Sequence, residues 1–137
     1  MLLSPNRYKF KSIFIRKTLK KNFLSPPFLN TGFQGLLAAE IGRLSSSQIE
    51  SARKYLRGAL KKDAKVWVSV FPSGMVTKKP QEVRMGKGKG YLKYWVHFAK
   101  KNEILFEAKG LNASLIRKSL TGAKFKLSVE SKLFSKY

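Results

Sequence analysis

The sequence has no cysteine, one histidine, and only seven aspartate and glutamate residues in a chain of 137. Without cysteine the chain forms no disulfide, binds no metal through thiolates and has no cysteine nucleophile. The single histidine, His97, argues against a catalytic triad or a multi-histidine metal site. Seven carboxylates leave few candidates for paired acid–base chemistry or for a calcium or magnesium site. We therefore expect neither an enzyme nor a protein that depends on a metal or cofactor.

Long apolar runs are also missing, because none approaches the roughly 18 residues that a transmembrane helix needs. Apolar residues still make up 43% of the chain and aromatic residues 12%. That content supplies a hydrophobic core, and the length suits one domain. The composition predicts a folded domain that does not span a membrane.

Positive charge is the dominant feature of the composition. Lysine and arginine number 29 against seven acids, which gives a formal net charge of +22. Such self-repulsion opposes compaction unless a polyanion neutralises it. Nucleic acid or an anionic membrane surface is therefore the expected class of partner.

Residues 1–30 are basic, contain no acid, and end in a Ser25-Pro26-Pro27 segment. The two prolines disfavour both a helix and a central strand, which predicts an extended basic arm, with a disordered tail as the alternative. A mitochondrial transit peptide has a similar composition, so composition alone leaves both interpretations open. Residues 31–137 are predicted to form a single α+β domain.

A helix is predicted from about Ser46 to Lys62. Ser45 and Gln48 form an S-x-x-Q capping box at its start. Apolar residues recur behind this box at helical spacing and fall on one face. The combination of cap and periodicity makes this segment the clearest helix in the sequence.

Basic residues at positions i, i+4 and i+8 run along the flank of that apolar stripe: Arg53, Arg57 and Lys61. A charged run on a helix is commonly only a solvated face. No carboxylate stands at i,i+4 to neutralise these three, which favours contact with phosphates.

Alternating apolar residues predict four strands, at Lys65–Phe71, Tyr91–Phe98, Ile104–Ala108 and Phe125–Val129. The first is apolar on both faces and is predicted to be buried. A second helix is expected between an N-cap at Asn112 and a stop at Gly122. The apolar segment 33–41 fits either a helix or a strand. The fold class is therefore α+β, with a mixed or antiparallel sheet and two helices.

Both tryptophans and the single histidine lie within these predicted strands: Trp67, Trp95 and His97. Exposed aromatic residues stack on bases in proteins that bind single strands. Neither tryptophan belongs to an RNP-type motif, however. We expect all three to be packed core residues.

A long connection, Pro72 to Gly90, separates two predicted strands, and structureless loops of such length are commonly functional. It ends in the sequence R-M-G-K-G-K-G, whose alternate glycines permit unusual backbone conformations close to a ligand. The interleaved lysines supply charges for phosphates. Neither nucleotide-binding pattern fits, because no Ser or Thr follows as in a P-loop and Tyr91 replaces the third glycine of G-x-G-x-x-G. A plain flexible loop remains an alternative to one that inserts into structured RNA, which we favour.

The R-M-G-K-G-K-G motif belongs to a wider set of matches along the chain. It precedes Tyr94-Trp95-Val96 and follows Gln48-Ile49-Glu50-Ser51-Ala52-Arg53, and the chain opens with Pro5-Asn6-Arg7-Tyr8-Lys9-Phe10-Lys11. With these residues the sequence resembles the universal large-subunit ribosomal protein sixteen family, called L-sixteen in bacteria and L-ten-e in eukaryotes. The similar residues extend over nearly the whole chain.

The resemblance implies a structural, non-enzymatic RNA-binding protein near the base of the central protuberance of the large ribosomal subunit. Its implied partners are large-subunit rRNA, tRNA acceptor ends and neighbouring ribosomal proteins; a membrane or a second copy of the chain is not among them. The implied rRNA-binding residues are Arg7, Lys9, Lys11, Arg16, Lys17, Arg43, Arg53, Arg57 and Lys61.

The same resemblance implies that the loop 78–90 reaches toward the peptidyl-transferase region, where the acceptor ends of A-site and P-site tRNA are positioned. The residues of this loop that match or flank the motif are Lys78, Lys79, Arg84, Met85, Gly86, Lys87, Gly88, Lys89 and Gly90. Arg84 matches the arginine that some bacteria hydroxylate.

Several positions depart from the family pattern. Residues 12–30 replace a basic run with Ile13-Phe14-Ile15 and the two prolines, and Ser73-Gly74-Met75 replaces a D-K-P turn. These changes suggest a divergent organellar branch, and we expect a mitochondrial ribosome, with the plastid as the alternative.

A generic basic RNA-binding or membrane-surface protein outside the ribosome is the competing function. The predicted helix 46–62 has many alanines on its apolar side, which argues against membrane binding.

Overall fold

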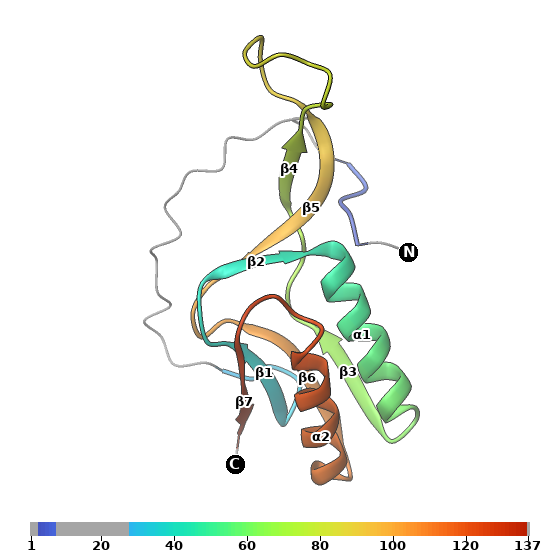
Figure 1. Ribbon diagram of the computed structural model, residues 1–137. Helices are drawn as coiled ribbons and strands as arrows, with labels where there is room; N and C mark the ends of the chain where they lie inside the picture. The colour runs from blue at the N-terminus through green and yellow to red at the C-terminus, as the bar shows by residue number, and fades with distance from the viewer. Residues whose placement is uncertain (1–2, 8–27, 137) are drawn as a thin grey trace.

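The computed structural model describes residues 3–7 and 28–136 (Figure 1). Within these ranges the chain forms two helices and seven strands, and every strand pair is antiparallel. In chain order they are β1 (Gln34–Ala38), β2 (Gly42–Ser45), α1 (Ser46–Leu60), β3 (Ala64–Val68), β4 (Gly74–Lys78), β5 (Tyr91–Ala99), β6 (Ile104–Gly110), α2 (Ala113–Lys124) and β7 (Ser131–Ser135). The predicted α+β class is confirmed, although the strands divide between two sheets.

The body of the molecule is a four-stranded sheet with strand order β3-β6-β1-β7. Helices α1 and α2 pack side by side and together cover one face of this sheet (Figure 1). Leu36 and Phe106 lie opposite each other on adjacent strands and face the helices. Leu56 and Leu120 meet them from α1 and α2, and all four side chains are at most 1% exposed. Burial of this apolar surface is the main stabilising contribution to the fold.

The second sheet has three strands in the order β2-β5-β4. Strand β2 pairs with residues 96–99 of β5, and β4 pairs with residues 91–96. Beyond the end of β2, therefore, only two strands continue. Figure 1 shows this β4–β5 hairpin projecting from the body, with a loop at its tip. The sheet topology thus carries the residues after β4 away from the hydrophobic core.

The connection between β3 and β5 is not structureless, and that prediction is wrong. Gly74–Lys78 forms β4, so the irregular loop shrinks to residues 79–90. Met75 is 1% exposed and pairs with Trp95, which ties this strand into the second sheet. Pro72 and Gly74 resemble turn residues in the sequence, and a short strand that begins at a glycine has a weak local signal.

Strand β3 is an edge strand, contrary to the prediction that it is buried on both faces. It pairs only with β6 among the described strands and ends at Val68 rather than Phe71. Val66 and Val68 pack against the core, whereas Trp67 on the other face is half-buried. A run of apolar residues indicates a strand without showing how many neighbours it has.

Two predictions near the C-terminus are also wrong. Gly122 does not end α2, which continues to Lys124. A Cβ at Gly122 would overlap the Tyr55 hydroxyl of α1, so this glycine lets the two helices approach closely. The apolar alternation at 125–129 forms no strand: the Lys126 and Leu127 amides donate to carbonyls at the end of α2, and β7 begins at Ser131 instead.

Both predicted helix starts are confirmed. The Ser45 hydroxyl accepts from the Gln48 amide at 3.3 Å, and the Gln48 side chain accepts from the Ser45 amide at 2.9 Å. At α2 the Asn112 side chain accepts from the Leu115 amide at 3.1 Å. These contacts satisfy backbone donors that have no partner within the helix.

Replacing Asn112 with alanine is expected to lower the free energy of unfolding by about 1 kcal/mol, because the Leu115 amide loses its acceptor. Ser114→Ala is the matched control, since Ser114 is exposed in the first turn of α2. Chemical denaturation with circular dichroism measures both variants. Equal stability of the two would show that the Asn112 cap contributes nothing.

Candidate nucleic-acid interface

The tip of the β4–β5 hairpin has an unusual backbone. Gly86, Lys87 and Gly88 have φ angles of 95°, 53° and 93°. Three successive residues therefore lie at positive φ, which glycine adopts without the steric cost that other residues incur. The Lys79 ammonium donates to the Gly86 carbonyl across the loop. The alternation of glycine in the motif thus produces a specific turn of the backbone at the tip.

Gly90 closes the loop at its neck. A Cβ at this position would lie 2.6 Å from the Lys78 carbonyl carbon and oxygen. Any larger residue would force β4 and β5 apart where the hairpin begins. The last glycine of the motif is therefore required by a close backbone approach, for a different reason from that of Gly86 and Gly88.

Residues 81–89 are all exposed, and Met85 is fully so. The loop presents Arg84, Lys87 and Lys89 with one acid, Glu82. Positive charge on a surface that is far from the core is well placed for phosphates.

Two tyrosines beside this loop were missed in the sequence. Tyr91 is 83% exposed and Tyr94 is 42% exposed, both on β5. Tyr91 lines a hollow of about 450 Å³ with Lys78, Lys79, Pro80, Gln81, Leu92 and Lys93. Strand alternation alone does not reveal that this end of β5 extends beyond the core, so exposed aromatic residues there resemble core residues in the sequence.

The flank of α1 differs from its prediction in one respect. Glu50, three residues before Arg53, accepts two hydrogen bonds from that guanidinium, at 2.7 and 2.8 Å. The bonds from Arg53 hold the pKa of the Glu50 carboxyl below its ordinary value. A search limited to i,i+4 spacing overlooks this partner. Arg57 and Lys61 are exposed, and in the part of the chain that the structure describes neither forms an ion pair.

A basic hollow of about 320 Å³ lies between α1 and the edge strand β3. Its lining residues are Arg53, Arg57, Lys61, Ala64, Lys65, Val66 and Trp67. The structure therefore brings the predicted helix cations together with Lys65 and Trp67, which the sequence did not indicate as binding residues.

The remaining predicted rRNA-binding residues lie apart from this hollow. Arg43 on β2 is exposed, and its guanidinium lies 5.8 Å from the centroid of the Phe98 ring. Arg7 is also exposed. Lys9, Lys11, Arg16 and Lys17 are outside the residues that the structure describes.

A buried carboxylate anchors the chain just before β1. The Glu107 side chain on β6 is 3% exposed and accepts from the Thr31 amide at 2.8 Å, the Thr31 hydroxyl at 2.9 Å and the Gly32 amide at 2.8 Å. Burial by itself would raise the Glu107 pKa, but these hydrogen bonds outweigh it and the pKa lies below its ordinary value. Glu107 thus determines where the segment that follows the N-terminal region joins the sheet.

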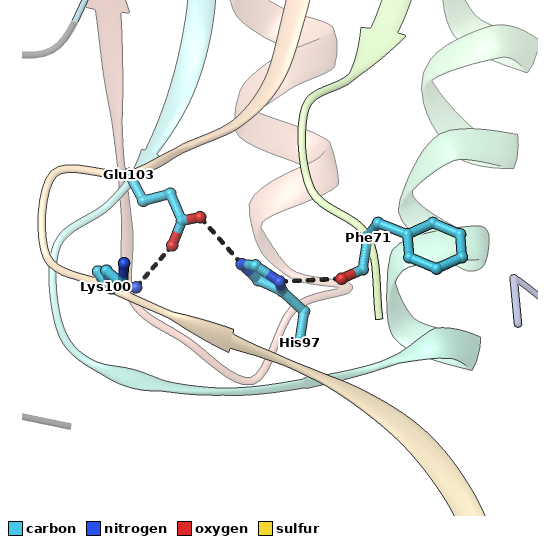
Figure 2. A network of polar contacts seen from close by, with 4 residues as sticks. All are labelled: Phe71, His97, Lys100 and Glu103. Carbon is cyan, nitrogen blue, oxygen red and sulfur yellow. Dashed lines mark hydrogen bonds and ion pairs between the residues drawn. The ribbon is translucent and has the colours of Figure 1, made fainter. Parts of the chain in front are cut away.

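His97 on β5 contacts two connecting segments, at Phe71 before β4 and at Glu103 before β6 (Figure 2). Its Nδ1 lies 3.1 Å from the Phe71 carbonyl and its Nε2 lies 3.1 Å from Glu103 Oε1. The other Glu103 oxygen accepts from the Lys100 amide at 2.7 Å. Burial by itself would raise the Glu103 pKa, but the hydrogen bonds from His97 and Lys100 outweigh this effect and the pKa lies below its ordinary value. This packed arrangement agrees with a structural histidine.

A family model described as ribosomal protein L16p/L10e matches residues 8–134, and these include the helix α1, the hairpin and its glycine-rich tip. The chain belongs to the ribosomal protein L16p/L10e family. The predicted family is confirmed, and the L16p/L10e family is structural and non-enzymatic.

Several curated relatives share this family and are each named large ribosomal subunit protein uL16. One from Buchnera aphidicola subsp. Baizongia pistaciae is 39% identical over 135 residues, which cover 98% of each chain. One from Wigglesworthia glossinidia brevipalpis is 38% identical with the same coverage. Another from Buchnera aphidicola subsp. Acyrthosiphon pisum is 37% identical.

These relatives overturn the predicted location. They are bacterial, so the expectation of a mitochondrial ribosome, with the plastid as the alternative, is wrong. The organellar branch rested on the altered residues 12–30 and a few substitutions. Such departures show divergence within the L16p/L10e family and carry no information about the compartment.

In residues 3–7 and 28–136, no helix has the length and apolar character to cross a membrane. Within the same ranges, no three histidine, aspartate or glutamate side chains gather where they would hold a metal ion.

Proposed function

We propose that this protein is a structural constituent of the large ribosomal subunit, where it binds large-subunit rRNA near the central protuberance and the peptidyl-transferase region. The loop 78–90 would help to position the acceptor ends of A-site and P-site tRNA. One observation carries the proposal: the R-M-G-K-G-K-G motif of this ribosomal protein is exposed at the tip of a hairpin that projects from the body (Figure 1).

The geometry of the tip supports contact with a nucleic-acid backbone. Residues 86–88 turn the backbone at the tip through positive φ angles, and Gly86 and Gly88 have no side chain to keep a ligand away. Arg84 and Lys87 add exposed positive charge. Backbone and cationic contacts of this kind position an RNA without performing chemistry on it.

The rRNA-binding part of the proposal concerns the body and the arm. We assign the arm to residues 1–30 and the domain to residues 31–137. On the domain, Arg57 and Lys61 offer exposed cations along α1, and Arg43 offers another on β2. Contacts between such side chains and phosphates give affinity that falls as salt rises, through counterion release.

Replacing Lys87 and Lys89 with alanine is expected to weaken tRNA binding to large subunits that contain the protein, by about tenfold or more. The physical reason is the loss of two cations at the tip. Each phosphate contact contributes roughly 0.7–0.9 to the slope of log affinity against log salt, so two lost contacts lower the affinity at moderate salt. Subunits reconstituted with the variant and titrated with labelled tRNA acceptor fragments measure the effect.

The matched control is Lys126→Ala with Lys132→Ala, which removes the same charge from exposed positions away from the hairpin. We expect this control pair to leave tRNA binding within about twofold of the wild type. Equal thermal stability of both variants would show that the hairpin substitutions act on binding. Unchanged tRNA affinity in the hairpin variant would contradict the role of the loop, and association with free RNA but never with subunits would favour a generic RNA-binding protein.

A further inference from the structure

Trp67 stands out among the described aromatic residues because it borders two basic hollows. One is the hollow between α1 and β3, lined by Arg53, Arg57, Lys61, Lys65 and the strand itself. The other, about 390 Å³ in volume, is lined by Trp67 with Thr31, Lys62, Asp63, Ala64, Lys65 and Lys109. Trp67 is therefore half-buried at the β3 edge and lies next to positive charge in both hollows.

We infer that the hollow between α1 and β3 binds one unpaired nucleotide of an RNA strand, with its base stacked on Trp67 and its flanking phosphates on Arg57, Lys61 and Lys65. This inference rests on the proposed function, since it takes RNA as the partner. It adds the kind of RNA that this face recognises: a single-stranded or bulged nucleotide rather than a continuous duplex.

The cations are brought to one wall by the way α1 ends. Arg57 and Lys61 are one helical turn apart, and the Lys61 amide donates to the Arg57 carbonyl at 2.9 Å. Lys61 has a φ of 43°, which reverses the chain, and β3 begins three residues later. Lys65 on the strand therefore faces the same hollow as the end of the helix. Lys65 thus adds its positive charge to those of Arg57 and Lys61 although it lies on a strand outside the helix.

Three of the cations in this hollow are available to bind a ligand. Arg53 is held by Glu50 and is half-buried, so it contributes mainly to the wall of the hollow. Arg57, Lys61 and Lys65 are exposed, and among residues 3–7 and 28–136 none of the three forms an ion pair. No acid is among the residues that line this hollow. A phosphate of a bound RNA would therefore supply the hydrogen-bond acceptors for these side chains.

The aromatic ring is what distinguishes an unpaired nucleotide from a duplex. Phosphates of a double helix need cations alone, whereas proteins that bind single strands combine a basic groove with an aromatic platform. Trp95 is 9% exposed and packs in the second sheet, whereas Trp67 is half-buried on an edge strand. Tryptophan is normally well buried, so a ring left accessible beside several cations indicates a binding role.

The test uses Trp67 as its own reporter. In a Trp95→Phe variant of the full chain, Trp67 is the only tryptophan. We expect a single-stranded RNA of twelve nucleotides to quench its fluorescence, with the same midpoint as the fluorescence anisotropy of the end-labelled RNA. We expect an RNA duplex of equal length to bind with little quenching. If the variant does not fold, fluorotryptophan incorporated into the wild-type protein gives two ¹⁹F resonances, and only the Trp67 signal should shift.

A substitution series tests the energetic contribution. Trp67→Leu should weaken single-strand binding by about five- to one-hundredfold, which is the range for the loss of one base–aromatic stack, and should change duplex binding less than twofold. Trp67→Phe keeps a ring and should recover part of the affinity. Thermal melts of both variants establish that they are folded.

The outcomes separate the two proposals. Tight RNA binding with no Trp67 response, and with equal affinity in Trp67→Leu, would overturn the stacking site and leave the ribosomal function intact. Absence of binding to any RNA at low salt would overturn both. A Trp67 response to polyglutamate that exceeds the response to RNA would show an acidic protein as the partner of this hollow and would overturn the nucleotide site.

Discussion

Replacing Glu107 with alanine is expected to lower the free energy of unfolding by about 3 kcal/mol, one of the two largest effects that the structure predicts. The carboxylate is 3% exposed and accepts three hydrogen bonds of 2.8–2.9 Å from Thr31 and Gly32. Alanine would leave the buried Gly32 amide and the part-buried amide and hydroxyl of Thr31 without this acceptor. Gly32 also lies against the β6 backbone, where a Cβ would approach the Ala108 carbonyl at 2.9 Å, so the segment has little room to rearrange.

Denaturant unfolding measures this change, with Glu82→Ala as the matched control because Glu82 is exposed in the hairpin loop. The control should stay within about 0.5 kcal/mol of the wild type. Glu107→Gln keeps the size and one acceptor oxygen, and should fall between wild type and Glu107→Ala. A Glu107→Ala protein as stable as the control would mean that the anchor before β1 contributes nothing.

The same carboxylate makes the stability depend on pH. The pKa of Glu107 lies below its ordinary value in the folded state, so the folded protein binds fewer protons than the unfolded chain. Its stabilising contribution is therefore complete above the unfolded pKa of about 4.3 and is lost as pH falls through the folded pKa. The Glu103 and Glu50 pKa values are lowered in the same direction. Wild type should lose stability below about pH 4.3, and Glu107→Gln should lose less over the same window.

Replacing Arg57 and Lys61 with glutamine is expected to weaken binding to large-subunit rRNA by about thirtyfold at 100 mM salt. Two lost phosphate contacts reduce the slope of log affinity against log salt by about 1.5, which corresponds to that factor. Roughly five contacts in the wild type would make affinity fall by two to three decades between 50 and 200 mM salt. Filter binding of an rRNA fragment across this salt range measures both quantities.

Lys126→Gln with Lys132→Gln removes the same net charge from positions outside the hollow. Lys132 lies on β7, at the opposite edge of the four-stranded sheet from β3, and both side chains are exposed. We expect this pair to lower affinity about threefold at most. If both pairs weaken binding equally, affinity depends on total charge alone, and the flank of α1 is not a binding face. A shallow salt dependence of the wild type would contradict phosphate contacts altogether.

Local features of the chain were predicted correctly because neighbouring residues cause them. The capping box of Ser45 and Gln48 and the cap at Asn112 depend on residues three positions apart, so a short segment contains all the partners. The glycines at 86 and 88 act in the same way, because positive φ is a property of each residue. The family was likewise evident, since its motif is contiguous.

The errors occurred where distant residues decide the outcome. Gly122 resembles a helix stop, yet its role is to accommodate Tyr55 from another helix. The alternation at 125–129 resembles a strand, but β1 pairs with 131–135 instead. Glu50 neutralises Arg53 at a spacing that a search for i,i+4 partners does not examine. In each case the outcome depends on a contact with a residue that lies outside the local pattern.

The net charge of +22, the R-M-G-K-G-K-G motif and the membership of the ribosomal protein L16p/L10e family follow from composition and contiguous residues. Only the tertiary structure showed that the motif lies at the end of a projecting hairpin and that Arg57, Lys61, Lys65 and Trp67 share one hollow. The physical reason is that a surface is formed by elements that meet through the core. Strand order and helix packing determine which cations converge. Neither can be read from the spacing of apolar residues along a short segment.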